Sequence, residues 1–165
     1  MTSGANYVGF FGAVKNGAVV QNLTVDIRTN GTQFVGGIAG GTDQEVHIRN
    51  CEVYGTVSAT GNFVGGVVGL LRIPDEATVE NCKVFADVVT NGGSVGGLVG
   101  CNRATVINCY VSADATVKGT AASELPLVGS SPNVGAITGE NQTNGENIGT
   151  AAGCGLCDAN GKPAA

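Results

Sequence analysis

The chain has 165 residues, of which 28 are Gly and none is Trp; 42% are hydrophobic and only 13% are charged. A chain this apolar can bury a modest core, which argues against wholesale disorder despite its glycine content. The net charge is −5, and Lys and Arg never cluster, which excludes the basic footprint of a nucleic-acid-binding protein. No apolar run approaches the ~20 residues of a membrane span, and residues 1–6 lack the basic and apolar regions of a signal peptide.

Two short phrases alternate along the chain. The first is Val-Gly-Gly-x-x-Gly, clearest within residues 34–40, 63–69 and 94–100, with a variant opening copy at 7–12 and a faint last copy at 133–139. The second is a Val-rich phrase that contains Asn, at residues 19–25, 46–53, 78–84 and 105–111. The closing glycines of the first phrase lie 28, 29, 31 and 39 residues apart. A period near thirty indicates stacked supersecondary units.

The abundance of Val, Thr and Gly favours strands and turns over helices. Units of two or three short strands could be propeller blades, sandwich hairpins or the coils of a β-solenoid. We expect residues 1–6 to be a linker at the start of the chain and residues 7–139 to be the repeat region. Within that region, 117–132 is predicted to be a loop insertion that leaves the stack. Residues 140–165 are predicted to be a terminal cap or a flexible tail.

The aligned repeats favour the solenoid. Apolar residues alternate on both sides of a recurring Asn, but their phase slips by one residue there, as it does when a strand turns a corner. In a parallel solenoid the same corner recurs about 4.8 Å higher in each coil, so that equivalent side chains stack. The predicted ladders are Asn22, Asn50, Asn81 and Asn108, with each amide bonded to the next, and the inward Cys51, Cys82 and Cys109.

The predicted fold is therefore all-β, a short parallel β-solenoid of about 4–5 coils with ~30 residues per coil. Tyr7, Phe34 and Phe63 share one column and are expected to stack. The outward Arg49 and Glu80 should lie on adjacent coils, and so should Glu52 and Lys83, as opposite-charge pairs.

No catalytic constellation is evident. His47 has no second His with which to form a zinc site or a triad. The Gly-Gly pairs are not followed by a helix or by the Lys-Ser/Thr of a phosphate-binding loop. Acidic residues such as Asp43 and Asp75 are scattered, and no pair recurs on one coil as glycoside hydrolysis would require. We therefore predict no enzyme site, no cofactor and no metal site.

The phrases at 95–100 and 106–111 together resemble the GLUG repeat of bacterial surface proteins. The second and third copies resemble it as well, so the resemblance covers roughly residues 7–111. It implies an extracellular or cell-surface location, in adhesin-like proteins or in the non-catalytic parts of IgA-cleaving metalloproteases. Those proteases carry H-E-x-x-H, which this chain lacks, so the resemblance transfers no catalytic residue.

Cys154 and Cys157 form a C-x-x-C motif, which could be redox-active, half of a metal site that includes Cys101, or a local disulfide. In an extracellular protein, a structural disulfide between Cys154 and Cys157, or no function at all, is the favoured interpretation.

The predicted function is a non-enzymatic rigid spacer or adhesive module of a secreted or cell-surface bacterial protein. Its expected partners are a host glycan or protein and the flanking domains of a larger parent protein. Two alternatives stay open. One is a carbohydrate-active or carbohydrate-binding β-helix that acts on polysaccharide. The other is head-to-tail self-assembly through uncapped coil ends.

Overall fold

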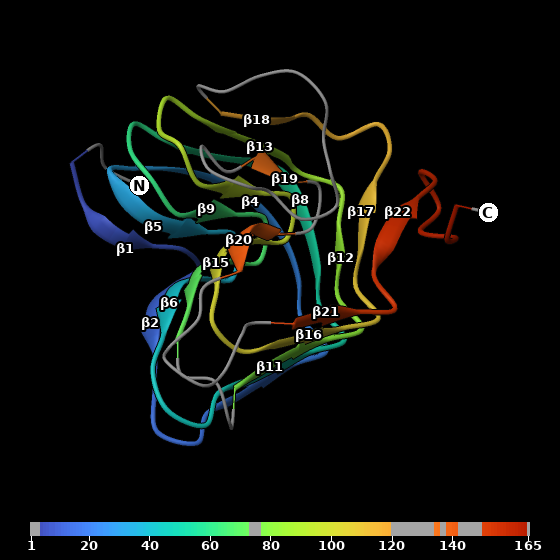
Figure 1. Cartoon of the computed structure of the whole chain (residues 1–165), viewed down its shortest axis with the longest axis horizontal. Helices are drawn as coiled ribbons and strands as arrows, with labels where there is room; N and C mark the ends of the chain where they lie inside the picture. The colour runs from blue at the N-terminus through green and yellow to red at the C-terminus, as the bar shows by residue number, and fades with distance from the viewer. Residues whose placement is uncertain (1–3, 73–76, 120–133, 136–137, 142–149, 165) are drawn as a thin grey trace.

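A computed structural model describes residues 4–72, 77–119, 134–135, 138–141 and 150–164. The described residues form a parallel β-solenoid without a helix, so the predicted fold class is confirmed (Figure 1). In the described part of the chain, no helix is long and apolar enough to cross a membrane. Asp75 lies outside the described residues, as does most of the predicted loop insertion.

Each coil passes through four sheets in the same order. The first coil consists of β1 (Asn6–Val8), β2 (Phe11–Val14), β3 (Val19–Gln21) and β4 (Thr24–Gly31). The second consists of β5 (Gln33–Gly36), β6 (Ala39–Thr42), β7 (His47–Arg49) and β8 (Glu52–Ala59). The third consists of β9 (Val64–Gly65), β10 (Val68–Leu71), β11 (Thr78–Glu80), β12 (Lys83–Val84) and β13 (Asp87–Thr90).

The fourth coil consists of β14 (Val95–Gly96), β15 (Val99–Asn102), β16 (Thr105–Ile107), β17 (Tyr110–Ser112) and β18 (Val117–Lys118). The fifth is described in part, as β19 (Val134–Gly135), β20 (Thr138–Asn141), β21 (Thr150–Ala152) and β22 (Gly155–Cys157). Strand β18 pairs in parallel with β13, so the stack extends two residues into the range that was predicted to be a loop.

The four sheets are named here by their places in the coil. Sheet A contains β1-β5-β9-β14-β19, and sheet B contains β2-β6-β10-β15-β20. Sheet C contains β3, β7, β11, β16 and β21, and sheet D contains the strands from β4 and β8 to β18 and β22. All the strand pairs that build these sheets are parallel; Val79, for example, pairs with Ile48 on one side and with Val106 on the other.

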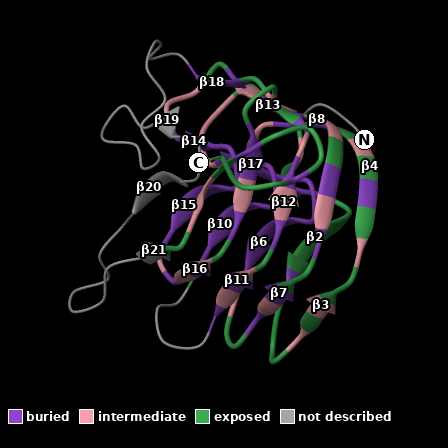
Figure 2. Ribbon diagram, turned by 90° about the vertical axis from the view of Figure 1, so that its right-hand side faces the viewer, coloured by how far each residue is buried: buried purple, intermediate pink, exposed green. Residues whose placement is uncertain are grey.

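The core is a set of columns of small apolar side chains that run from coil to coil. Figure 2 shows buried residues recurring on the successive strands β6, β10 and β15. The column of Ile48, Val79 and Val106 in sheet C is fully buried, and so is the column of Val53 and Val84 in sheet D. Each buried Val or Ile contributes roughly 1.5–3 kcal/mol relative to an exposed position. The alternating Val and Thr pattern therefore fixes which side of each strand faces inward.

The Gly-Gly pairs lie where the next coil and core side chains approach the backbone closely. A Cβ atom on Gly66 would lie 2.5 Å from Val84 Cγ1 and closer still to the carbonyl oxygen of Gly97 in the next coil. A Cβ on Gly37 would meet Val53 and Gly66 in the same way. These glycines are therefore required because coil-to-coil packing leaves no room for a side chain.

The two ends of the stack differ. After β22 the chain turns back, because Asp158 N–H donates to Lys162 O (2.9 Å) and Ala164 N–H donates to Leu156 O (2.8 Å). Cys157 and Pro163 form an antiparallel bridge, so this return covers the C-terminal edge of sheet D. Part of the predicted 140–165 tail thus forms the fifth coil and a cap. At the other end, β4 pairs with β8 on one side, and its other edge has no strand partner among the described residues.

Candidate functional site

The recurring Asn occupies the corner between sheets C and D. Asn22, Asn50, Asn81 and Asn108 have φ values of 57°, 53°, 52° and 51°, in the left-handed region that Asn tolerates better than most residues. The fifth coil has Gly153 at this corner, with φ of 64°. The corners are joined by backbone hydrogen bonds, since Asn50 N–H donates to Glu80 O and Asn81 N–H donates to Ile107 O, both at 3.0 Å.

The side chains of these asparagines do not form the amide-to-amide ladder that was expected. All four are exposed, and within the described residues no hydrogen bond joins one of their amides to the next. The left-handed backbone at the corner turns the side chain away from the core, and the Asn108 amide oxygen lies against Gly153 at the corner of the next coil. The Asn column thus serves the structure through its backbone conformation.

The cysteines form a second column, directly after this corner. The carbonyl oxygens of Leu23, Cys51, Cys82 and Cys109 each accept the N–H of the residue after the equivalent position in the next coil. The fifth member of the column is therefore Cys154, the first cysteine of the C-x-x-C motif. Each thiol caps the carbonyl two residues before it: Cys82 Sγ–Glu80 O is 3.2 Å, and Cys154 Sγ–Ala152 O is 3.4 Å.

Cys154 and Cys157 are both free thiols in the structure. Cys154 lies in the cysteine column at the corner, whereas Cys157 is buried in sheet D, where β22 pairs Cys157 with Ser112. Cys101 lies in another sheet, in β15. Within the described residues, no group of three or more His, Cys, Asp or Glu side chains could hold a metal ion.

Cys154 is expected to be alkylated much faster than the buried thiols of the folded protein. The hydrogen bond from the Cys109 side chain lowers the pKa of Cys154 to about 7, and its side chain is partly exposed. For Cys51 and Cys109, hydrogen bonding to a neighbouring thiol and burial raise the pKa, whereas Cys82, whose pKa is lowered by hydrogen bonding to Cys109 and Cys51, is fully buried and out of reach of the reagent. Because the thiolate is the reactive form, the rate at Cys154 should fall as pH drops below about 7.

Peptide mass spectrometry after brief iodoacetamide treatment measures these rates, with Cys154→Ser as the control. Equal labelling of Cys109 and Cys154 in the folded protein would contradict the cysteine column.

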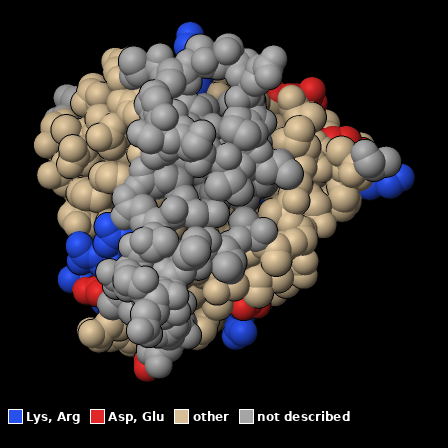
Figure 3. Space-filling model, viewed as in Figure 1, with Lys and Arg blue, Asp and Glu red and all other residues tan. Residues whose placement is uncertain are grey.

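His47 and the predicted pair of Arg49 and Glu80 lie on the outer side of sheet C. His47 Nδ1 lies 3.0 Å from Thr78 Oγ1 in the next coil, so its ring links two coils. Arg49 and Glu80 do lie side by side, as predicted, but Arg49 Nε donates instead to Gln21 Oε1 (2.9 Å) in the preceding coil. Around the atoms drawn in grey in Figure 3, Lys and Arg occur in separate places near the rim.

The aromatic column is stacked, as predicted. The ring centroids of Tyr7 and Phe34 lie 4.6 Å apart and those of Phe34 and Phe63 lie 5.2 Å apart, with interplanar angles of 14° and 4°. All three residues have positive φ, from 54° to 64°. Such values are uncommon for bulky residues, and here stacking and the close approach of the glycine phrase hold them. The fourth coil has the buried Ser94 at this position, so the stack spans three coils.

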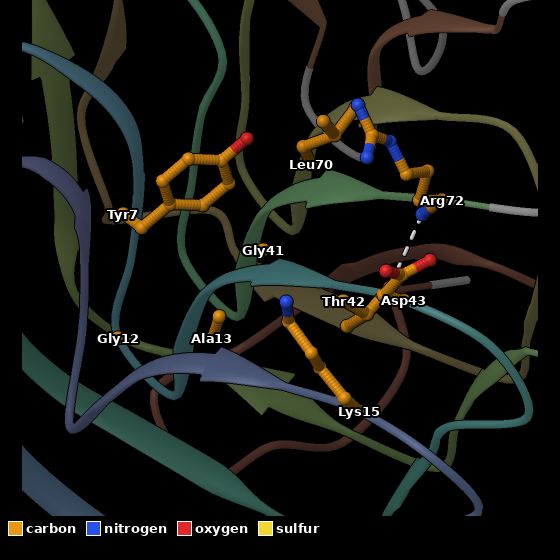
Figure 4. Close-up of a pocket in the computed structure, with 9 residues that line it drawn as sticks. All are labelled: Tyr7, Gly12, Ala13, Lys15, Gly41, Thr42, Asp43, Leu70 and Arg72. Carbon is orange, nitrogen blue, oxygen red and sulfur yellow. Dashed lines mark hydrogen bonds between the residues drawn. The ribbon is translucent and has the colours of Figure 1, made fainter.

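A concave notch lies beside Tyr7, with a volume of about 280 Å³ (Figure 4). Its floor is the outer side of sheet B, where Ala13, Gly41 and Leu70 are aligned in register on successive coils. The Tyr7 ring forms one wall and lies against Gly41, because a Cβ on that glycine would be 2.9 Å from the ring. The small floor residues of the first two coils create the hollow, and the larger Leu70 closes it at the third.

The opposite wall carries charge. Lys15, Asp43 and Arg72 follow the ends of successive sheet B strands, and all three line the notch. Their backbones are held in order, since Asp43 N–H donates to Val14 O (3.0 Å) and Arg72 N–H donates to Thr42 Oγ1 (3.1 Å). The side chains of Lys15 and Arg72 are exposed. An aromatic ring facing two cations and one carboxylate gives the notch both an apolar platform and convergent polar groups.

The fourth coil matches a known family. Residues 91–118, which contain its glycine phrase and its Asn-Cys corner, match the family model described as the GLUG motif. The fourth coil is a GLUG motif. One GLUG motif therefore corresponds to one turn of the solenoid, and the chain is a repeat module. The other coils share its strand register, its corner and its glycine positions. No curated protein sequence matches the chain.

A solved structure has a similar fold: a protein from Bacteroides ovatus, provisionally named an immunoglobulin A1 protease, with a TM-score of 0.57 and 19% sequence identity. The similarity covers 88% of this chain and 52% of the other, so the chain spans about half the length of that protein. At this identity the similarity concerns the fold alone.

Proposed function

We propose that this GLUG-repeat chain is a non-enzymatic structural and adhesive module of a secreted or cell-surface bacterial protein. It acts as a rigid spacer between the flanking domains of a larger parent and presents a binding surface to a host glycan or protein. The observation that carries this proposal is the continuity of the four parallel sheets over successive coils. Continuous hydrogen-bonded ladders with buried apolar columns resist bending, while the outer faces of the coils stay available for contacts.

The notch supports binding over hydrolysis. Among its described lining residues Asp43 is the one carboxylate, whereas glycoside hydrolysis uses a pair of carboxylates on either side of the scissile bond. Incubation with a panel of polysaccharides should therefore release no new reducing ends. Turnover of any polysaccharide would instead favour the carbohydrate-active alternative.

The adhesive role can be tested on cells. Antibodies raised against the chain should label intact bacteria that produce the parent protein, and the purified, fluorescently labelled chain should bind host cells. Treating the host cells with glycosidases or with proteases identifies which kind of partner is bound. Labelling only after the bacteria are permeabilised would contradict the surface location, and no binding to host cells would contradict the adhesive role.

Self-association is a second candidate role, favoured by the first coil, in which strand β4 has one edge without a strand partner among the described residues. Four large hydrophobic side chains of that coil are exposed by 39–52%: Tyr7, Phe10, Phe11 and Val19. The C-terminal edge of sheet D is covered by the chain's own return, which works against head-to-tail addition there. We propose instead that two copies join through their N-terminal edges.

Strand β4 has a self-complementary charge pattern. Asp26 and Arg28 are both exposed on its outer face, on either side of Ile27. In an antiparallel pair centred on Ile27, Asp26 of each copy lies opposite Arg28 of the other. Such cross-strand pairs contribute roughly 0.2–1 kcal/mol each.

Light scattering over a concentration series tests this pairing. The dimer should be weakened by Asp26→Arg or by Arg28→Asp alone and restored in the double variant, which exchanges the two charges. Lys118→Asp, an exposed charge reversal in β18, is the matched control. A wild-type chain that stays monomeric at every concentration, or a double variant no better than the single ones, would contradict the pairing.

A further inference from the structure

The notch beside Tyr7 has a composition unlike that of the chain around it. Two of its lining residues are cations and one is an anion, whereas the chain as a whole has a net charge of −5. In the described part of the chain, Lys15, Asp43 and Arg72 form no ion pair with one another, although they share one wall (Figure 4). The side chains of Lys15 and Arg72 are exposed, so they can reach a ligand in the notch.

We propose that this notch binds one carboxylate-bearing sugar unit, such as a uronic acid residue at the end of an acidic glycan. The proposal rests on the adhesive role described above and names the ligand class for it. A volume of about 280 Å³ lies at the small end of ligand pockets, which suits a single sugar ring better than a folded peptide segment.

Each wall matches a different part of such a ligand. The Tyr7 side chain is 40% exposed and is held by stacking on Phe34 and by contact with Gly41, so its ring offers a fixed apolar surface to the C–H groups of a sugar. On the other wall, the Arg72 guanidinium and the Lys15 ammonium can bind the ligand carboxylate through charge-assisted hydrogen bonds.

Asp43 selects among anions. Its carboxylate can accept hydrogen bonds from sugar hydroxyls, but it lies on the same wall as the cations and repels a second negative charge. A monoanion with neighbouring hydroxyl groups therefore fits better than a phosphate dianion. A neutral sugar would offer no carboxylate to this wall, on which two cations outnumber one anion.

Two probes that differ in one group test the proposal: methyl glucuronide, which carries a carboxylate, and methyl glucoside, which carries a hydroxymethyl group in its place. In two-dimensional NMR titrations of the whole chain, methyl glucuronide should shift the amides of Gly41, Thr42 and Arg72. Methyl glucoside should bind at least tenfold more weakly. Inorganic phosphate and tetraglutamate serve as rival anions and should not compete at equal concentration.

Variants then locate the site. Lys15→Gln and Arg72→Gln should each weaken binding of methyl glucuronide about tenfold or more, while Lys118→Gln removes an exposed charge elsewhere and should leave it unchanged. All three positions are exposed, so the fold should be kept, and the NMR spectrum reports this directly. Equal binding of both glycosides, competition by phosphate or tetraglutamate, or equal binding by the Lys15→Gln variant would overturn the proposal. Binding of methyl glucuronide without any binding to host cells would overturn the adhesive role and leave the site intact.

Discussion

Replacing Gly66 by Ala should unfold the protein or lower its free energy of unfolding by about 3 kcal/mol or more. The added methyl group would lie 2.5 Å from Val84 Cγ1 and closer still to the carbonyl oxygen of Gly97. One of these contacts is with the next coil and the other is across the narrow core, so neither neighbour can move without disturbing a strand. Urea denaturation followed by circular dichroism measures the loss.

Gly155→Ala is the matched control for that substitution. A Cβ on Gly155 would meet only Tyr110, at 3.9 Å, which is an ordinary van der Waals distance. This variant should keep the wild-type urea midpoint. If Gly66→Ala were as stable as Gly155→Ala, the coils could not be packed as closely as the structure has them.

Replacing Asn81 by Val should cost about 2 kcal/mol of stability, whereas replacing it by Gly should change stability by less than about 1 kcal/mol. The reason is the backbone at the corner, where Asn81 has φ of 52°. A β-branched residue is strained at that angle, but Gly is not, and Gly153 already occupies the same corner in the fifth coil. Thermal denaturation of the two variants gives the comparison.

Glu80→Val is the control, because it places the same side chain one residue earlier, in strand β11. Val is well suited to a strand, so this variant should be at least as stable as the wild type. A larger loss for Asn81→Gly than for Asn81→Val would mean that the amide side chain, and not the backbone conformation, stabilises the corner.

The solenoid could be predicted from the sequence because the same residue types recur at equivalent positions of successive coils. The columns of Val79 and its equivalents gave the inward face, and the phase slip at the Asn marked the corner. The role of the Asn side chain was harder to predict. Its position in the column indicated stacking, but whether the amide points along the stack or into solvent depends on the left-handed backbone, which the sequence does not display.

Two features could not be predicted, for different reasons. Cys154 belongs to the cysteine column, but it follows Cys109 by 45 residues instead of about 30, so the repeat spacing did not reveal it. A glycine one residue before it, in place of Asn, was the available signal. The notch depends on Ala13 and Gly41 being smaller than Leu70 at one register position. These differences in side-chain size predict a hollow only once the register of the stacked coils is known.

The central claim is that successive repeats lie directly above one another as parallel strands. Nuclear Overhauser contacts in the isotope-labelled protein test it most directly, at Val79. The structure predicts backbone contacts from Val79 to both Ile48 and Val106, which are its partners in the coils on either side. Contacts from Val79 to another strand of its own repeat, in an antiparallel hairpin pattern and without those to Ile48 and Val106, would contradict the solenoid and the spacer role inferred from it.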